Sequence, residues 1–263
     1  MPDREHVTGD SASPAAAKAG APTEVAPDRR PLRSRRSQVV QRLAHRLASA
    51  GVRANAISAS SMLAAAVAAA AMVATRFATG SEDSTWADRA LWLAAAAGIQ
   101  VRLLANLLDG LVAVEGHQRT PTGELWNEVP DRVSDTLILV AAGAACTVDV
   151  AAGVALGTVA ALVAMFVSYV RAVGKSLTGT SDYSGPMAKP QRMAALTVAA
   201  VATAVIPQSL ETQLAIGQPW LARPIIALAL LVITLGGAWT GVRRLRRLAR
   251  SLTSSSSRPP SQP

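Results

Sequence analysis

The chain has 263 residues, 50% of them hydrophobic, and a formal net charge of +9, with 26 Lys and Arg against 17 Asp and Glu. Its single cysteine, Cys146, excludes a disulfide framework and a thiolate metal cluster. The hydrophobic residues fall into long Ala/Val/Leu blocks that favour a membrane protein. Because the basic residues flank these blocks, anionic lipid headgroups are the expected partner and no nucleic acid is expected.

The N-terminal part of the chain divides into two segments. Residues 1–33 are rich in Ala, Pro and Thr without periodicity, which predicts a disordered cytoplasmic tail. From Ser34 to Ala50, apolar residues recur at helical spacing against arginines, as in an amphipathic helix that lies in the headgroup region. A solvated basic helix is the alternative. The apolar stripe consists of Val39, Val40, Leu43 and Leu47.

Six apolar blocks follow, each close to the roughly 20 residues that a helix needs to cross a bilayer core. Helices are the expected form, because lipid offers no partner for backbone polar groups. The predicted spans are Ile57–Phe77, Trp86–Leu108, Val129–Val148, Ala151–Val173, Met193–Pro207 and Pro224–Val242. We therefore predict an all-α integral membrane domain over residues 34–250, followed by a disordered tail over 251–263.

Arginines orient this predicted bundle. They cluster before the first span and after the last, whereas the connections near Asp149 and Glu211 carry almost no positive charge. An even number of spans with basic ends places both termini in the cytoplasm. The expected location is the bacterial inner (cell) membrane.

Polar residues at fixed intervals join the second and third spans. They are Asn106, Asp109, Gly110, Ala113, Val114, Gly123, Asn127 and Asp131. This segment resembles the signature of the CDP-alcohol phosphotransferase (CDP-alcohol phosphatidyltransferase) family, D-x2-D-G-x2-A-R-x8-G-x3-D-x3-D, and keeps every interval. Asn106 and Asn127 stand where that pattern has aspartates, and Val114 stands where it has arginine.

Helical spacing predicts how these residues meet. Asn106 and Asp109 share one helix face, and Asn127, Asp131 and Asp135 share another. A short loop from Gly110 to Gly123 brings the two faces together. Their carboxylate and amide oxygens suit Mg²⁺ or Mn²⁺, which prefer hard oxygen ligands. The expected metal ligands are Asn106, Asp109, Asn127 and Asp131.

The family resemblance implies a reaction. An alcohol attacks the β-phosphorus of CDP-diacylglycerol or a similar CDP-alcohol, and CMP leaves, as in phospholipid biosynthesis. It also implies that Asp109 binds metal, that Asp131 is the catalytic base, and that Gly110, Ala113 and Gly123 contact substrate. The alternative is a catalytically degenerate member that acts as a membrane binding or interaction protein. A homodimer is left open.

Cationic residues supply a second set of predicted substrate contacts. Ser168–Ala172 resembles the family's S-Y-x-R-A helix ending, which implies that Arg171, Lys189 and Arg192 hold an acceptor phosphate. Ordinary positive flanking of membrane spans is the alternative. Arg102 lies within the second span on the face of Asp109, where it can pair with Asp131 or with a substrate phosphate. A snorkelling arginine is the alternative there.

The predicted topology can be tested by cysteine labelling in a Cys146→Ala background. Cysteines at Gly80 and Gln213 should react only from the face opposite the cytoplasm, because the Lys and Arg excess holds the other connections inside. Accessibility to a membrane-impermeant maleimide measures this. Labelling of either position from the cytoplasmic side would contradict the six-span topology.

Overall fold

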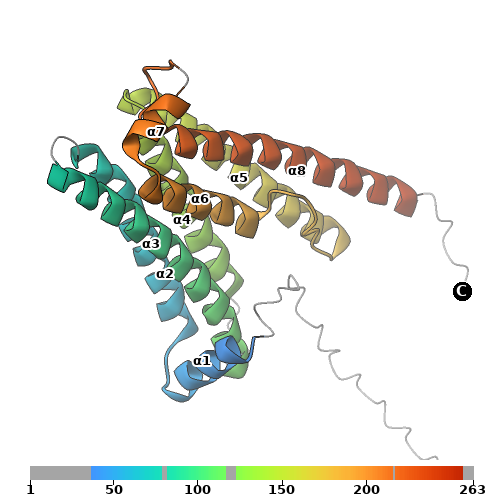
Figure 1. Ribbon diagram of the computed structural model, residues 1–263. Helices are drawn as coiled ribbons and strands as arrows, with labels where there is room; N and C mark the ends of the chain where they lie inside the picture. The colour runs from blue at the N-terminus through green and yellow to red at the C-terminus, as the bar shows by residue number, and fades with distance from the viewer. Residues whose placement is uncertain (1–36, 79–81, 117–122, 216, 257–263) are drawn as a thin grey trace, which may run out of the picture.

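Helices account for every named element of the protein (Figure 1). The computed structural model describes residues 37–78, 82–116, 123–215 and 217–256, so the predicted tail over 1–33 lies outside it. The helices are α1 (Gln38–Ser49), α2 (Ala54–Ala74), the 3-10 turn η2 (Thr75–Phe77), α3 (Glu82–Glu115), α4 (Gly123–Cys146), α5 (Val150–Thr178), α6 (Lys189–Val205), α7 (Gln208–Leu214) and α8 (Pro224–Ser256). Each predicted apolar block falls largely on one of these helices.

Four helical stretches of the described chain are long and apolar enough to cross a bilayer. They are Ala54–Phe77, Thr85–Glu115, Val150–Thr178 and Pro224–Ser254. Helix α4 carries Asp131, Arg132 and Asp135 near its beginning, and α6 has only 17 residues. The structure therefore confirms an all-helical, membrane-like protein, while the third and fifth spans stay predictions.

Two predicted boundaries differ from the structure. The loop expected from Gly110 is wrong, because α3 continues to Glu115 and includes Gly110 and Ala113. No Gly or Pro lies between Gly110 and Gly116, and Val112 is fully buried, so packing extends the helix. At the other end of the chain, α8 runs to Ser256, beyond the predicted domain end at 250.

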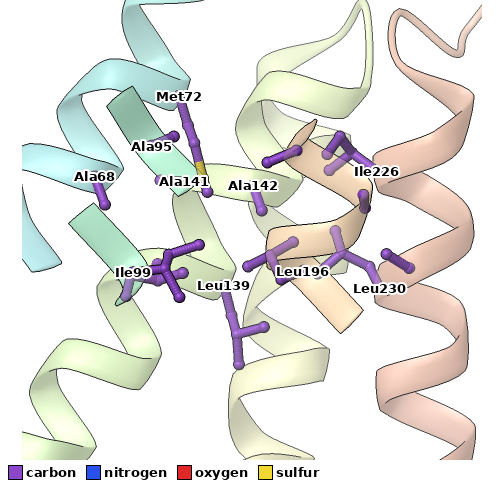
Figure 2. Packing of buried hydrophobic residues seen from close by; sticks show 14 of the residues in the cluster. Ala68, Met72, Ala95, Ile99, Leu139, Ala141, Ala142, Leu196, Ile226 and Leu230 are labelled. Atoms are coloured by element: carbon purple, nitrogen blue, oxygen red, sulfur yellow. The ribbon is translucent and has the colours of Figure 1, made fainter. Parts of the chain in front are cut away.

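Helix α2 is the element that joins the two halves of the signature. It packs extensively against both α3 and α4, whereas α3 and α4 have little backbone contact with each other. Helix α6 packs against α3 and α8, and α5 packs against α4 and α8. The core between them is rich in alanine and includes Met72, Ile99 and Leu139 (Figure 2).

Helix α1 docks against the protein as well as presenting an apolar edge. Ala44 is completely buried in a cluster with Leu108 and Val112 of α3. Of the predicted apolar stripe, Val40 and Leu47 pack on this cluster, whereas Val39 is 72% exposed. The stripe therefore divides between the protein core and the surroundings.

An ion-pair cluster holds the end of the bundle opposite α1 (Figure 1). The Arg223 guanidinium contacts Asp88 Oδ1 at 2.7 Å and Glu211 Oε2 at 3.1 Å, and all three residues are buried. Burial raises the pKa of Glu211 and outweighs the lowering effect of Arg223. These contacts tie α3, α7 and the start of α8 together.

Helices α4 and α5 cross at three glycines. A Cβ on Gly143 would lie 2.2 Å from Gly153 O, and a Cβ on Gly157 would lie 2.4 Å from Leu139 O. Only glycine allows the two backbones to approach this closely, as at many helix contacts in membranes. The crossing positions the first turns of α4, which carry the polar residues of the signature.

The crossing predicts different effects for the same substitution at two positions of α5. Gly157→Ala should destabilise the protein by roughly 1–3 kcal/mol, because the added methyl group meets backbone atoms that cannot move aside. Gly174→Ala is the matched control, since its Cβ would meet only Leu248 side-chain carbons at 4.0 Å. Thermal unfolding in detergent measures both. Equal melting temperatures for the two variants would contradict the proposed role of the glycine crossing.

Candidate functional site

A buried cluster of charges lies where α3, α4 and α6 meet. It comprises Arg102 on α3, Asp131 and Asp135 on α4, and Lys189 and Arg192 at the start of α6, and we call it the ion-pair site. Arg102 is 0% and Arg192 1% exposed. Buried charges of this kind persist only when they are paired, so the ion-pair site is held by its own contacts.

Arg102 joins α3 to α4. Its Nη2 lies 2.7 Å from Asp135 Oδ1 and 3.2 Å from Asp131 Oδ1, and it also donates to the Asp131 carbonyl at 3.1 Å. The pairing with Asp131 was one of the two roles predicted for this residue. The second carboxylate, Asp135, follows from the helical spacing that places it one turn after Asp131.

Lys189 and Arg192 bind the same two carboxylates from α6. Lys189 Nζ contacts Asp131 Oδ2, and Arg192 Nη2 contacts Asp135 Oδ2 at 3.1 Å. Both oxygens of Asp131 therefore carry a cation. The contacts of Lys189 and Arg192 with an acceptor phosphate stay predictions.

Asp109 lies on α3, about two turns after Arg102. It is 4% exposed and accepts a hydrogen bond from Ser58 Oγ of α2 at 2.8 Å. Its other oxygen, Oδ1, is buried without a hydrogen-bond partner among the described residues. Asp109 is within electrostatic reach of Asp131 and Lys189. Ser58 was not predicted, although a serine in an alanine-rich span is a signal of a polar contact.

The remaining signature residues lie on the last turns of α3 and the first turns of α4. Asn106 is half-buried on α3, Gly110 and Ala113 lie on its last turns, and Gly123 begins α4. Asn127 lies on α4, but its side chain is outside the described part of the structure. Within that part, no group of three or more His, Cys, Asp and Glu side chains is arranged to hold a metal ion.

Arg171 belongs to a separate site. It lines a cavity of about 200 Å³ together with Arg244 and Arg247 of α8 and hydroxyl groups of the α5–α6 connection. Arg244 donates to Ser184 O at 2.8 Å and to Val167 O at 3.2 Å. We call this the arginine cavity. The arginines of α8 were interpreted only as flanking charge, so the sequence did not reveal their approach to Arg171.

Glu128 closes one side of Arg171. Its carboxylate contacts both Arg171 and Arg132. Burial alone raises the pKa of Glu128, but these two guanidinium groups outweigh it and hold the pKa below its usual value. Glu128 therefore stays ionised beside Arg171 and Arg132.

Solved structures with the same fold include those of a phosphatidylinositol phosphate synthase. The Mycobacterium tuberculosis enzyme with CDP-DAG bound aligns with a TM-score of 0.58 at 16% identity over 81% of this chain and 94% of that chain. The chain has the fold of phosphatidylinositol phosphate synthase. The same enzyme with manganese and citrate gives a TM-score of 0.58 at 17% identity, over 80% of this chain and 88% of that one.

The likeness to phosphatidylinositol phosphate synthase supports the family resemblance that the signature predicted. Its apo form also aligns, with a TM-score of 0.54 at 16% identity over 78% of this chain and 93% of that one. No protein-family model matches the chain, and no curated protein matches it. The fold is thus shared, while the sequence has diverged widely.

The ion-pair site predicts unequal effects for two arginines. Arg102→Gln should destabilise the protein by roughly 3–5 kcal/mol, because it leaves Asp131 and Asp135 buried with one cation fewer. Arg132→Gln should cost at most about 1 kcal/mol, since its pair with Glu128 is partly exposed. Thermal unfolding in detergent compares the two. A similar small loss in both variants would show that Arg102 does not hold the site together.

Proposed function

We propose that the chain is an integral membrane CDP-alcohol phosphotransferase. It transfers a phosphatidyl group from CDP-diacylglycerol or a similar CDP-alcohol to an alcohol acceptor and releases CMP. The observation that carries this proposal is Asp109, a buried carboxylate with one unpartnered oxygen, placed beside Asp131 in the fold of a synthase solved with CDP-DAG bound. The signature intervals around both aspartates support it further.

The oxygen donors near Asp109 fit one hard divalent cation. An unpartnered buried carboxylate oxygen is costly unless a cation or proton satisfies it. Asp109 and the amide oxygens of Asn106 and Asn127 would hold Mg²⁺ or Mn²⁺, with substrate phosphate oxygens completing the ligand set. When bound, such an ion offsets negative charge on the diphosphate.

The chain's own residues account for the transfer. Asp131 accepts the proton of the acceptor hydroxyl as its oxygen forms a bond to the β-phosphorus. The bond from that phosphorus to the CMP oxygen breaks, and CMP leaves with the electron pair. Arg102 and Lys189 contact the two carboxylate oxygens of Asp131 and fix the position of that carboxylate before the acceptor arrives.

The arginine cavity provides the place for a phosphorylated acceptor. Arg171, Arg244 and Arg247 line one cavity of about 200 Å³, which the Asp182 carboxylate also lines. Planar guanidinium groups match phosphate oxygens in pairs, and an acceptor phosphate would exchange with the ion pair to Glu128. The acceptor alcohol is therefore proposed to carry a phosphate group.

The membrane setting follows the same proposal. Four helical stretches long and apolar enough to cross a bilayer, together with α4 and α6, would make six spans with both termini in the cytoplasm. Donor lipid and membrane lipids would reach the site from the cytoplasmic leaflet. The location is a bacterial inner membrane.

A specific observation favours a second candidate, a non-catalytic binding protein. Both Asp131 oxygens and both Asp135 oxygens contact cations of the chain itself. Two further signature carboxylates are replaced by Asn106 and Asn127. A protein of this kind would bind the nucleotide-lipid without turnover, so release of CMP separates the two candidates.

The purified protein should release CMP from radiolabelled CDP-diacylglycerol when Mn²⁺ and a suitable alcohol from a phosphorylated and unphosphorylated panel are supplied. Asp109→Asn and Asp131→Asn should each lower this rate about 100-fold or more, because each removes a charge that an amide cannot supply. Near-normal turnover in either variant would show that the assigned role is wrong.

Asp149→Asn is the matched control for these variants. Asp149 caps α5 by accepting a hydrogen bond from Ala151 N at 3.0 Å, and asparagine caps helices equally well. This variant should keep the native rate of CMP release. If the native protein itself releases no CMP with any alcohol or metal, the binding-protein alternative replaces the enzyme.

A further inference from the structure

The ion-pair site carries its own counter-charge. Its two carboxylates, Asp131 and Asp135, contact three cations, Arg102, Lys189 and Arg192. Asp109, outside the site, is within electrostatic reach of Asp131 and Lys189. With Asp109 included, three negative and three positive formal charges cancel before any metal ion binds. A cluster of unpaired carboxylates would instead attract divalent ions strongly, since the attraction grows with each added negative charge.

Lys189 differs from the two arginines in how firmly it is held. It is the first residue of α6, where the helix dipole disfavours a cation, and its side chain is 20% exposed. Its contact with Asp131 Oδ2 offsets that disadvantage. A lysine ammonium on a flexible stem can withdraw from such a contact, whereas Arg102 is fully buried and fixed by three acceptor atoms.

The carboxylate that Lys189 contacts is a signature position predicted to bind metal. Asn127, one turn earlier on α4, brings no charge that could compete for a cation there. By contrast, Asp109 accepts a hydrogen bond from the Ser58 hydroxyl, is influenced by the Gly110 backbone amide, and has a buried Oδ1 without a hydrogen-bond partner among the described residues. Asp135 Oδ1 also lacks a hydrogen bond, but it lies 2.7 Å from Arg102 Nη2. Asp109 and Asp131 are therefore unequal, because both oxygens of Asp131 contact cations.

We infer that the Lys189 ammonium is a tethered cation that takes the place of a second divalent ion on Asp131. The site then binds a single Mn²⁺ or Mg²⁺ ion, on the side of Asp109. This inference rests on the proposed function for the identity of the ligand. It goes further by assigning Lys189 a role in which its ammonium competes with a metal ion for Asp131. The family resemblance had implied that Lys189 binds an acceptor phosphate.

Manganese binding tests the inference directly. Mn²⁺ is titrated into the purified full-length protein in detergent, and free Mn²⁺ is followed by electron paramagnetic resonance. The native chain should bind one Mn²⁺. Lys189→Gln should lower the Kd for Mn²⁺ about tenfold or create a second site, because the freed carboxylate gains the interaction that the ammonium held.

Two variants control for charge and folding. Lys175→Gln removes the same charge from the end of α5 and should bind Mn²⁺ as the native protein does. Lys189→Arg keeps a cation beside Asp131 and should also retain the native affinity and stoichiometry. Two Mn²⁺ ions on the native chain would overturn the inference, and this measurement stands even if Lys189→Gln does not fold.

Other outcomes separate the inference from the proposed function. Unchanged Mn²⁺ affinity in folded Lys189→Gln, with active native protein, would overturn the role of Lys189 and leave the transferase intact. Tighter Mn²⁺ binding by Lys189→Gln, with native protein that releases no CMP, would support the role of Lys189 and overturn the transferase. An equal increase in Mn²⁺ affinity in Lys189→Gln and Lys175→Gln would show that the effect comes from net charge alone, and would overturn the inference.

Discussion

Pairing of buried charge is the constraint on which the arrangement of α3, α4 and α6 depends. Arg102 is fully buried within an apolar helix, and such a charge is tolerated only with close partners. Asp131 and Asp135 of α4 are these partners, and Lys189 and Arg192 of α6 form ion pairs with the same two carboxylates. Since α3 and α4 have little backbone contact of their own, these ion pairs connect the two helices directly, in addition to the packing of α2 against both. The site and the fold therefore share one set of contacts.

Small residues allow the helices to pack closely enough for these ion pairs to form. The α4–α5 crossing at Gly143, Gly153 and Gly157 brings the backbones so close that a Cβ would lie within 2.4 Å of a neighbouring atom. Between helices in lipid, packing of this kind replaces much of the hydrophobic driving force that operates in water. The alanine-rich core shown in Figure 2 extends the same principle to the contacts among α2, α3, α4 and α6. A few buried polar contacts then select one arrangement among helices of similar composition.

The sequence predicted what depends on local patterns. Apolar block length located helices at all six predicted spans, and the tendency of charges within spans to pair gave Asp131 as one of two predicted partners of Arg102. It failed where tertiary contacts decide the outcome. Gly110 was interpreted as a turn residue, but burial of the neighbouring Val112 carries α3 past it. The family resemblance gave Lys189, Arg192 and Arg171 one role on an acceptor phosphate, which stays a prediction; the sequence did not show that the approach of α6 to α3 and of α8 to α5 puts them in two separate places. Ser58 belongs to neither signature motif, so only the packing of α2 on α3 reveals it.

The balance of charges has a consequence for the order in which ligands would enter the site. A cluster whose carboxylates are already paired attracts a free divalent ion weakly, because each cation of the chain offsets part of that attraction. A diphosphate changes the balance by adding negative charge and hard oxygen ligands of its own. In the proposed enzyme, the nucleotide-lipid and the metal ion would then bind together, with Asp109 as the anchoring carboxylate and the Lys189 ammonium free to move from Asp131 toward a phosphate. On this view the replacement of two signature aspartates by Asn106 and Asn127 does not empty the site of function. It transfers part of the metal's binding energy from the protein to the substrate.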